Sequence, residues 1–129
     1  MVYTHGMRSI VLGFDSLLDC LDEILTVPAV SEVRLGGVNG SKTIAGYEDV
    51  KEGRFGFKMA AKIDYDDSKT DIRALLRHIF HIAKENVVYL YYADLLDAIE
   101  AKAEAEESGM ADRLKVYKCC YFLPLRKSA

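Results

Sequence analysis

The chain has 129 residues, of which 50% are hydrophobic and 29% are charged, and its formal net charge is -3. This composition excludes a disordered or collagen-like chain, and the length predicts a single domain over residues 1–129. No apolar run reaches the roughly 20 residues of a membrane helix, and the N-terminus lacks a signal-peptide pattern, so we expect no membrane association. The chain has three cysteines, two of them adjacent. This number and spacing are not typical of the disulfide framework of a secreted protein, so we expect the protein to be located in the reducing cytoplasm.

The first predicted elements are a strand and a helix. Residues 8–14 are rich in β-branched side chains, which favours a strand. Residues 16–26 carry leucines and an isoleucine at helical spacing, and Pro28 ends this predicted helix. Residues 1–7 are expected to form a loose extension.

A three-stranded antiparallel meander is predicted next. Asn39-Gly40 tolerates the positive φ angles of a tight hairpin turn, and a second turn is placed at Glu52-Gly53. Both turns bring apolar residues onto one face of the sheet, which supports the register. The predicted strands are residues 32–36, 43–50 and 54–65.

The third of these strands has the clearest alternation in the chain. Phe55 and Phe57 share one parity, and Lys58 and Lys62 share the other. We therefore expect the phenylalanines to be buried and the lysines to lie on an outward sheet face with Tyr47.

The C-terminal half predicts two helices and two strands. Residues 69–85 form a strongly amphipathic helix, and residues 87–92 are an apolar run that favours a strand, with a continuing helix as the alternative. Residues 94–108 predict a helix whose inner stripe is Leu95, Leu96, Ile99 and Ala103. Residues 113–123 predict a last strand, and residues 125–129 a basic tail.

These elements predict one α+β domain with a mixed sheet. The expected order is strand, helix, three strands, helix, strand, helix, strand. The helices, at residues 16–26, 69–85 and 94–108, are expected to pack mainly on one face.

The favoured functional interpretation is a non-enzymatic interaction module, such as an inhibitor, an immunity-type protein or an adaptor. Acidic and basic side chains are segregated along the chain, tyrosines cluster in residues 89–92 and 117–121, and no catalytic set is recognisable. We expect a protein partner or a second copy of the chain, with a dimer favoured. The predicted contact residues are Tyr47, Lys58, Lys62, Asp97, Glu100 and Glu104.

Two alternatives come from other functional classes. Nucleic acid or another anionic ligand could bind the basic helix stripe of Arg73, Arg77, His81 and Lys84, together with Lys58 and Lys62. A metal-dependent nuclease or hydrolase could use Asp64, Asp66, Glu48 or His81. A solvated helix face and helix capping explain these residues without a ligand, so the sequence predicts no metal site and no cofactor.

Overall fold

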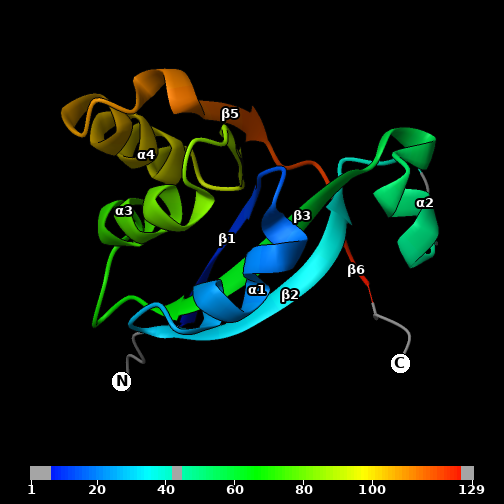
Figure 1. Cartoon of the computed structure of the whole chain (residues 1–129), viewed down its shortest axis with the longest axis horizontal. Helices are drawn as coiled ribbons and strands as arrows, with labels where there is room; N and C mark the ends of the chain where they lie inside the picture. The colour runs from blue at the N-terminus through cyan, green and yellow to red at the C-terminus, as the bar shows by residue number, and fades with distance from the viewer. Residues whose placement is uncertain (1–6, 42–44, 126–129) are drawn as a thin grey trace.

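Within the described residues, six strands form one sheet in the order β5-β4-β1-β3-β2-β6 (Figure 1). The computed structural model describes residues 7–41 and 45–125. Only β4 and β5 pair in parallel; the other neighbours are antiparallel. The strands are β1 (Met7–Gly13), β2 (Val30–Val38), β3 (Lys58–Asp66), β4 (Val88–Tyr92), β5 (Leu114–Lys118) and β6 (Phe122–Pro124). The helices are α1 (Leu17–Leu25), α2 (Tyr47–Lys51), α3 (Ile72–Ala83) and α4 (Leu95–Glu107), with 3-10 turns η1 (Arg54–Gly56) and η2 (Ala111–Arg113).

Helices α1, α3 and α4 cover one face of this sheet and enclose the main core (Figure 1). Successive strand residues point to opposite faces, so Leu12 of β1 and Ile63 of β3 reach this core while their neighbours do not. Helix α3 contributes Leu75, Leu76 and Ile79, the stripe that its sequence predicts. The prediction of an α+β domain with a mixed sheet and helices mainly on one face is confirmed.

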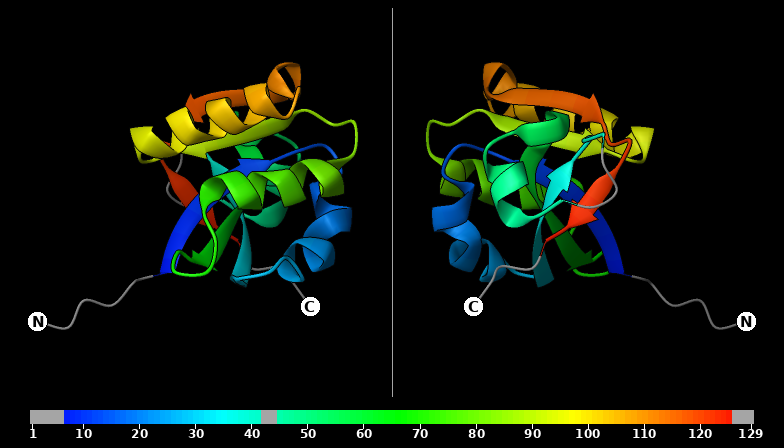
Figure 2. Two further views of the ribbon diagram at one scale, coloured as in Figure 1. Left: turned by 90° about the vertical axis from the view of Figure 1, so that its left-hand side faces the viewer. Right: turned by 90° about the vertical axis from the view of Figure 1, so that its right-hand side faces the viewer.

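The opposite face carries a second, smaller core, because the sheet curls (Figure 2). Strands β5 and β6 are the two edges of the sheet, yet only residues 119–121 connect them. So short a link cannot cross a flat sheet of six strands, since extended chain spans roughly 3.5 Å per residue. Curling therefore brings together Val11, Val38, Ala60 and Tyr91, with Cys119 and Phe122 packed against them.

The prediction of a strand over residues 43–50, in the middle of the meander, is wrong. Helix α2 occupies much of that segment, and residues 42–44 lie outside the described part of the chain. Strand β2 instead pairs directly with β3, with Leu35 opposite Ala61. Asn39 does have a positive φ, of 57°, but it leads the chain away from the sheet instead of into a hairpin.

The third predicted strand begins later than expected, at Lys58, because residues 54–56 form η1. Phe55 has a φ of 58° and is 44% exposed, so its predicted burial is wrong. Phe57 is fully buried as predicted, although it precedes the strand.

The C-terminal strands also differ from the prediction. Residues 88–92 form a strand, which decides between the two interpretations of that apolar run. The single strand predicted over residues 113–123 is two strands, β5 and β6, on opposite edges of the sheet. Met7 belongs to β1, whereas residues 1–6 and 126–129 of the predicted extension and tail lie outside the described residues.

Helix α4 faces the sheet with the side opposite to the predicted one. Its buried residues are Ala98, Ala101, Glu104 and Ala105. Leu95, Leu96 and Ile99, the expected inner stripe, are exposed, and Leu96 most of all at 66%. In residues 7–41 and 45–125, every helix falls short of the length and apolarity that a bilayer-spanning helix needs.

Candidate functional site

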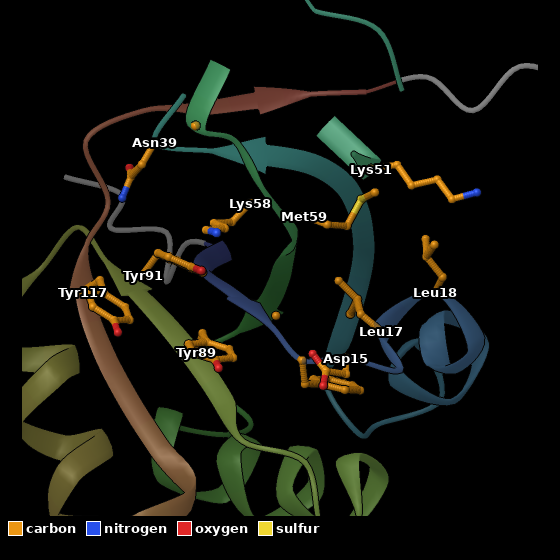
Figure 3. A pocket seen from close by; sticks show the side chains of 13 residues that line it. Asp15, Leu17, Leu18, Asn39, Lys51, Lys58, Met59, Tyr89, Tyr91 and Tyr117 are labelled. Carbon is orange, nitrogen blue, oxygen red and sulfur yellow. The ribbon is translucent and has the colours of Figure 1, made fainter. Parts of the chain in front are cut away.

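A pocket of about 780 Å³ opens where β1 turns into α1 (Figure 3). Ligand sites in proteins commonly have volumes of roughly 300–1,000 Å³. The start of α1 forms one wall, β3 contributes Lys58 and Met59, and the tyrosines of β4 and β5 form the opposite wall. With Asn39, residues from five separate parts of the chain therefore meet here.

The turn from β1 into α1 depends on a close approach between two strands. A Cβ atom on Gly13 would lie 2.7 Å from the carbonyl oxygen of Met59, so this position accepts glycine only. Phe14 follows, and its carbonyl accepts a hydrogen bond from the Leu17 amide at 3.0 Å, which begins α1. Phe14, Asp15 and Leu17 consequently line the pocket.

Three tyrosines form the wall contributed by β4 and β5. The ring centroid of Tyr117 lies 6.4 Å from that of Tyr89 and 6.0 Å from that of Tyr91, in stacked arrangements. Burial raises the pKa of the Tyr91 phenol, and Tyr117 adds to this effect. The Tyr91 phenol therefore stays protonated at neutral pH and can donate a hydrogen bond.

Lys58 brings a positive charge to this pocket. It is exposed, and Figure 3 places its side chain between Met59 and Tyr91. No carboxylate of the described residues lies within ion-pair distance of it. Lys62 shares its sheet face but is half-buried. Of the predicted contact residues Tyr47, Lys58 and Lys62, Lys58 alone lines the pocket. The Tyr47 ring is covered by the ammonium group of Lys51 in α2.

Asn39, which lines the pocket, forms hydrogen bonds with the segment that connects β5 and β6. Its side-chain amide donates to the Lys118 carbonyl at 2.9 Å, and its Oδ1 accepts from the amides of Cys120 and Tyr121. Its own backbone amide donates to the Tyr121 carbonyl at 2.7 Å. Because Asn39 lines the pocket, both cysteines of this link are held beside it.

The cysteines differ in their surroundings, and all three are free thiols. Cys119 packs beside Tyr91, and burial raises the pKa of its thiol, while Lys62 opposes that shift. Cys120 is exposed. Cys20 is buried in α1, with Sγ 3.8 Å from Ser16 Oγ. No cysteine is among the described residues that line the pocket.

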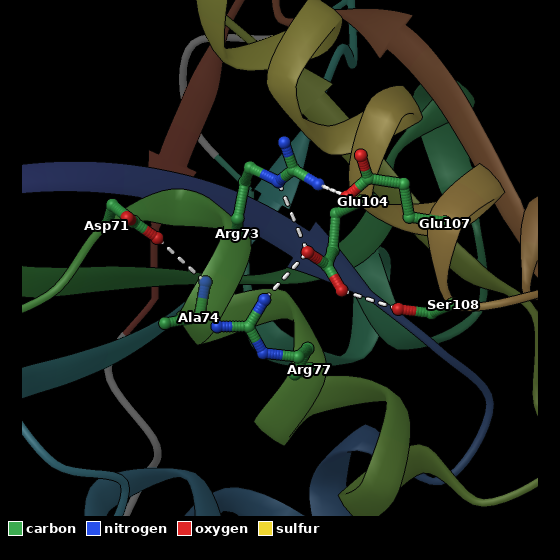
Figure 4. Close-up of polar contacts among 7 residues, drawn as sticks. All are labelled: Asp71, Arg73, Ala74, Arg77, Glu104, Glu107 and Ser108. Atoms are coloured by element: carbon green, nitrogen blue, oxygen red, sulfur yellow. Dashed lines mark hydrogen bonds and ion pairs between the residues drawn. The ribbon is translucent and has the colours of Figure 1, made fainter.

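Glu104, predicted as a partner contact, is instead buried between two helices (Figure 4). Its Oε1 accepts hydrogen bonds from Arg73 at 3.2 Å and Arg77 at 2.8 Å, and its Oε2 accepts one from Ser108 at 2.5 Å. Arg73 also pairs with Glu107. Two members of the predicted anion-binding stripe therefore bind carboxylates of this chain itself, and α3 is tied to α4.

We expect Glu104→Gln to lower the free energy of unfolding at pH 7 by about 2 kcal/mol, because it weakens charge-assisted hydrogen bonds. The Ser108 hydrogen bond, together with Arg73 and Arg77, holds the pKa of Glu104 below its usual value. A lowered folded-state pKa contributes stability that is present above the unfolded-state value and lost as pH falls through the folded-state value. In urea denaturation between pH 3 and 7, the free energy of unfolding should therefore fall less steeply with decreasing pH for the variant than for the parent chain.

Glu106→Gln is the matched control, because Glu106 lies exposed on the same helix. It should change the free energy of unfolding by about 0.5 kcal/mol or less. Equal stability of Glu104→Gln and the parent chain at every pH would refute the assigned role of Glu104.

The other predicted site residues do not converge. Asp97 pairs with Arg8, and burial raises the pKa of its carboxyl. Asp64 accepts hydrogen bonds from Arg34 and Ser9, and Asp66 accepts them from Ser68. The remaining predicted residues, Glu100, His81, Lys84 and Glu48, are exposed. In the described part of the chain, no three His, Cys, Asp or Glu side chains gather where a metal ion could bind.

Comparison with known proteins gives two kinds of match. The sequence profile described as peptide methionine sulfoxide reductase matches residues 14–95, more than half of the chain. Methionine sulfoxide reductase A of Corynebacterium diphtheriae has a similar fold, with a TM-score of 0.68, 10% identity, and coverage of 95% of this chain and 72% of that one. Reduced Mxr1 from Saccharomyces cerevisiae gives a TM-score of 0.70, 13% identity, and coverage of 94% and 81%. Curated protein sequences gave no match.

The profile match contradicts the interpretation of the chain as a non-enzymatic inhibitor or adaptor, because the matched family is one of enzymes. The alternative of a metal-dependent nuclease or hydrolase does not agree with a family of reductases either. Nucleic-acid binding stays a prediction. Sequence reasoning had singled out the tyrosine cluster and Lys58 as parts of a site, but not Gly13, Phe14 or Met59. The signal it could have used was a glycine at the end of a strand that leads directly into a helix.

Proposed function

The chain belongs to the peptide methionine sulfoxide reductase family, and we propose that it binds the methionine sulfoxide residues of peptides in the pocket beside α1. One observation carries this proposal. The matched residues 14–95 include Phe14 at the start of α1, Lys58 and Met59 of β3, and the β4 tyrosines, so the pocket is built largely from the family segment.

The chemistry of the pocket fits this side chain. Oxidation of methionine gives a polar, chiral sulfoxide on an otherwise apolar side chain. Met59, Leu17 and the tyrosine rings supply apolar surface for the methyl and methylene groups. The sulfoxide oxygen accepts hydrogen bonds, and the Lys58 ammonium is a donor without a carboxylate partner among the described residues. Lys58 is therefore the residue that distinguishes the sulfoxide from methionine.

Reduction of a sulfoxide to a thioether requires two electrons and two protons. Two thiols supply them when they form one disulfide, and the sulfoxide oxygen leaves as water. Since no cysteine lines the described pocket, the thiols have to come from beside it. Cys119 and Cys120, held next to Asn39 and Tyr91, are the pair that we assign to this step. Free thiols of this kind persist in a reducing cytoplasm, the location that we propose.

Binding is tested by isothermal titration with three small compounds: the N-acetyl amides of methionine sulfoxide, methionine and methionine sulfone. We expect the sulfoxide to bind about tenfold more tightly than methionine, because methionine has no oxygen on its sulfur that could pair with Lys58. Lys58→Met removes the ammonium and keeps the length of the side chain. It should abolish this preference.

Lys102→Met is the matched control, because Lys102 lies exposed on α4, outside the pocket. It should bind all three compounds as the parent chain does. Equal affinity of the parent chain for sulfoxide and methionine, or no binding of either, would overturn the proposed function.

A further inference from the structure

On the side away from β4, strand β5 pairs with no other strand among the described residues, although its Lys118 carbonyl accepts a hydrogen bond from the Asn39 side chain. It is the last strand in the sheet order, and β4 is its one strand neighbour among the described residues. In Figures 1 and 2 no other strand lies beyond it. The backbone N–H and C=O groups of such an edge strand can pair with an extended segment of another chain.

This edge and the pocket share a residue. Tyr117 stands near the middle of β5, lines the pocket and is 48% exposed. A strand added to β5 would lie about 4.8 Å from it and would place alternate side chains on the face where Tyr117 stands. A methionine sulfoxide on that face would lie beside the Tyr117 ring, at the edge of the pocket.

The charges along β5 favour an acidic segment. Lys115 and Lys118 are exposed, and no carboxylate of the described residues forms an ion pair with either. The sequence of β5 contains no acidic residue. Asp15, the carboxylate that lines the pocket, belongs to the wall formed by α1. Opposite charges across neighbouring strands attract each other, whereas like charges repel.

We propose that β5 is the docking strand for an extended, acidic peptide whose methionine sulfoxide side chain enters the pocket over Tyr117. This inference rests on the proposed function and adds the class of substrate. Main-chain pairing with β5 supplies affinity for any extended peptide, and Lys115 and Lys118 select acidic flanks.

The test uses the full chain and two pentapeptides with blocked ends, in which methionine sulfoxide is flanked on each side by two glutamates or by two lysines. The acidic peptide should bind about tenfold more tightly than the basic one, and this difference should shrink at high salt. The double variant Lys115→Glu/Lys118→Glu should reverse the preference. The control variant Lys69→Glu/Lys102→Glu, which changes exposed lysines elsewhere by the same charge, should keep it.

Pairing with the strand is tested separately with acidic peptides that carry N-methyl groups on alternate backbone nitrogens. Methylation of the nitrogens on one edge should reduce affinity about tenfold, because more than one backbone hydrogen bond to β5 is lost. Equal binding of the acidic and basic peptides, or of the methylated and unmethylated ones, would overturn the docking strand but leave the proposed function intact. If neither the pentapeptides nor the small sulfoxide binds, the proposed function itself fails.

Discussion

Replacing Phe57 by alanine should lower the free energy of unfolding by about 4 kcal/mol, the range found for large aromatic side chains deleted from a core. Phe57 is fully buried. Its ring fills space that the neighbouring chain leaves open, since a Cβ on Gly40 would lie 2.3 Å from the ring carbons and one on Gly37 would lie 2.8 Å away. The protein cannot collapse easily into the cavity because two backbone segments already contact the ring.

Chemical denaturation of the parent chain and the variant measures this difference, with Phe55→Ala as the matched control. Phe55 is two residues away and 44% exposed, so its replacement should cost about 1 kcal/mol or less. A loss of similar size for both variants would show that Phe57 does not anchor this segment.

The Phe57→Ala variant should also affect ligand binding in the pocket. Phe57 directly precedes Lys58, and Gly56 and Lys51 line the pocket beside it. Loss of the ring should loosen the segment that presents these residues, so sulfoxide binding should weaken at temperatures where the rest of the chain stays folded.

The elements that the sequence predicts well are those in which one strong pattern acts alone. Helix α3 has a complete apolar stripe and is capped by Asp71, whose carboxylate accepts a hydrogen bond from the Ala74 amide at 2.8 Å. Strand β3 alternates from Lys58 onward, with Ala60, buried on the opposite face, as the one exception. Local periodicity was enough for these elements because tertiary packing agrees with it.

The predicted meander failed because two local turn signals were correct but served another purpose. Asn39 and Gly53 both have positive φ angles. Instead of closing tight hairpins, Asn39 follows the end of β2 and Gly53 lies between α2 and η1, and Gly40 contacts the Phe57 ring. Alternation in so short a segment does not distinguish a strand from one turn of helix, and the packing of a distant ring decided the outcome.

Helix α4 shows why an apolar stripe can face outward. Alanines at positions 98, 101 and 105 present a flat surface, and Glu104 between them bonds to Arg73 and Arg77 of α3. The ion pairs compensate the buried charge, so the helix turns its polar residue inward and leaves Leu95 and Leu96 exposed. No pattern within residues 94–108 contains this information, because the arginines lie on another helix.

The pocket could not be predicted from the sequence either. The residues that line it come from five separate parts of the chain, and tertiary packing alone brings these parts together. The clustering of tyrosines in the C-terminal strands was the one usable signal. It predicted a surface where rings are half-buried, which is what Tyr89 and Tyr117 form, but it did not indicate the ligand.

Replacing Cys119 and Cys120 together by serine should reduce the turnover of a methionine sulfoxide peptide with dithiothreitol to the rate without protein. Serine keeps the approximate shape but cannot supply electrons by forming a disulfide. Cys20→Ser should leave turnover unchanged, because Cys20 is buried in α1 and is not one of the residues lining the pocket. Chromatographic separation of the sulfoxide peptide and the methionine peptide measures the rate.

The pH dependence of this turnover gives a second, independent readout. The attacking species is the thiolate, and burial raises the pKa of Cys119, so little thiolate exists at neutral pH. The rate of the parent chain should therefore be low at pH 7 and rise about tenfold per pH unit until the thiol ionises. The binding of the sulfoxide to Lys58 does not require the thiolate, so affinity should stay level over the same range. A rate that is independent of pH, or one that survives in the double serine variant, would remove these cysteines from the reaction.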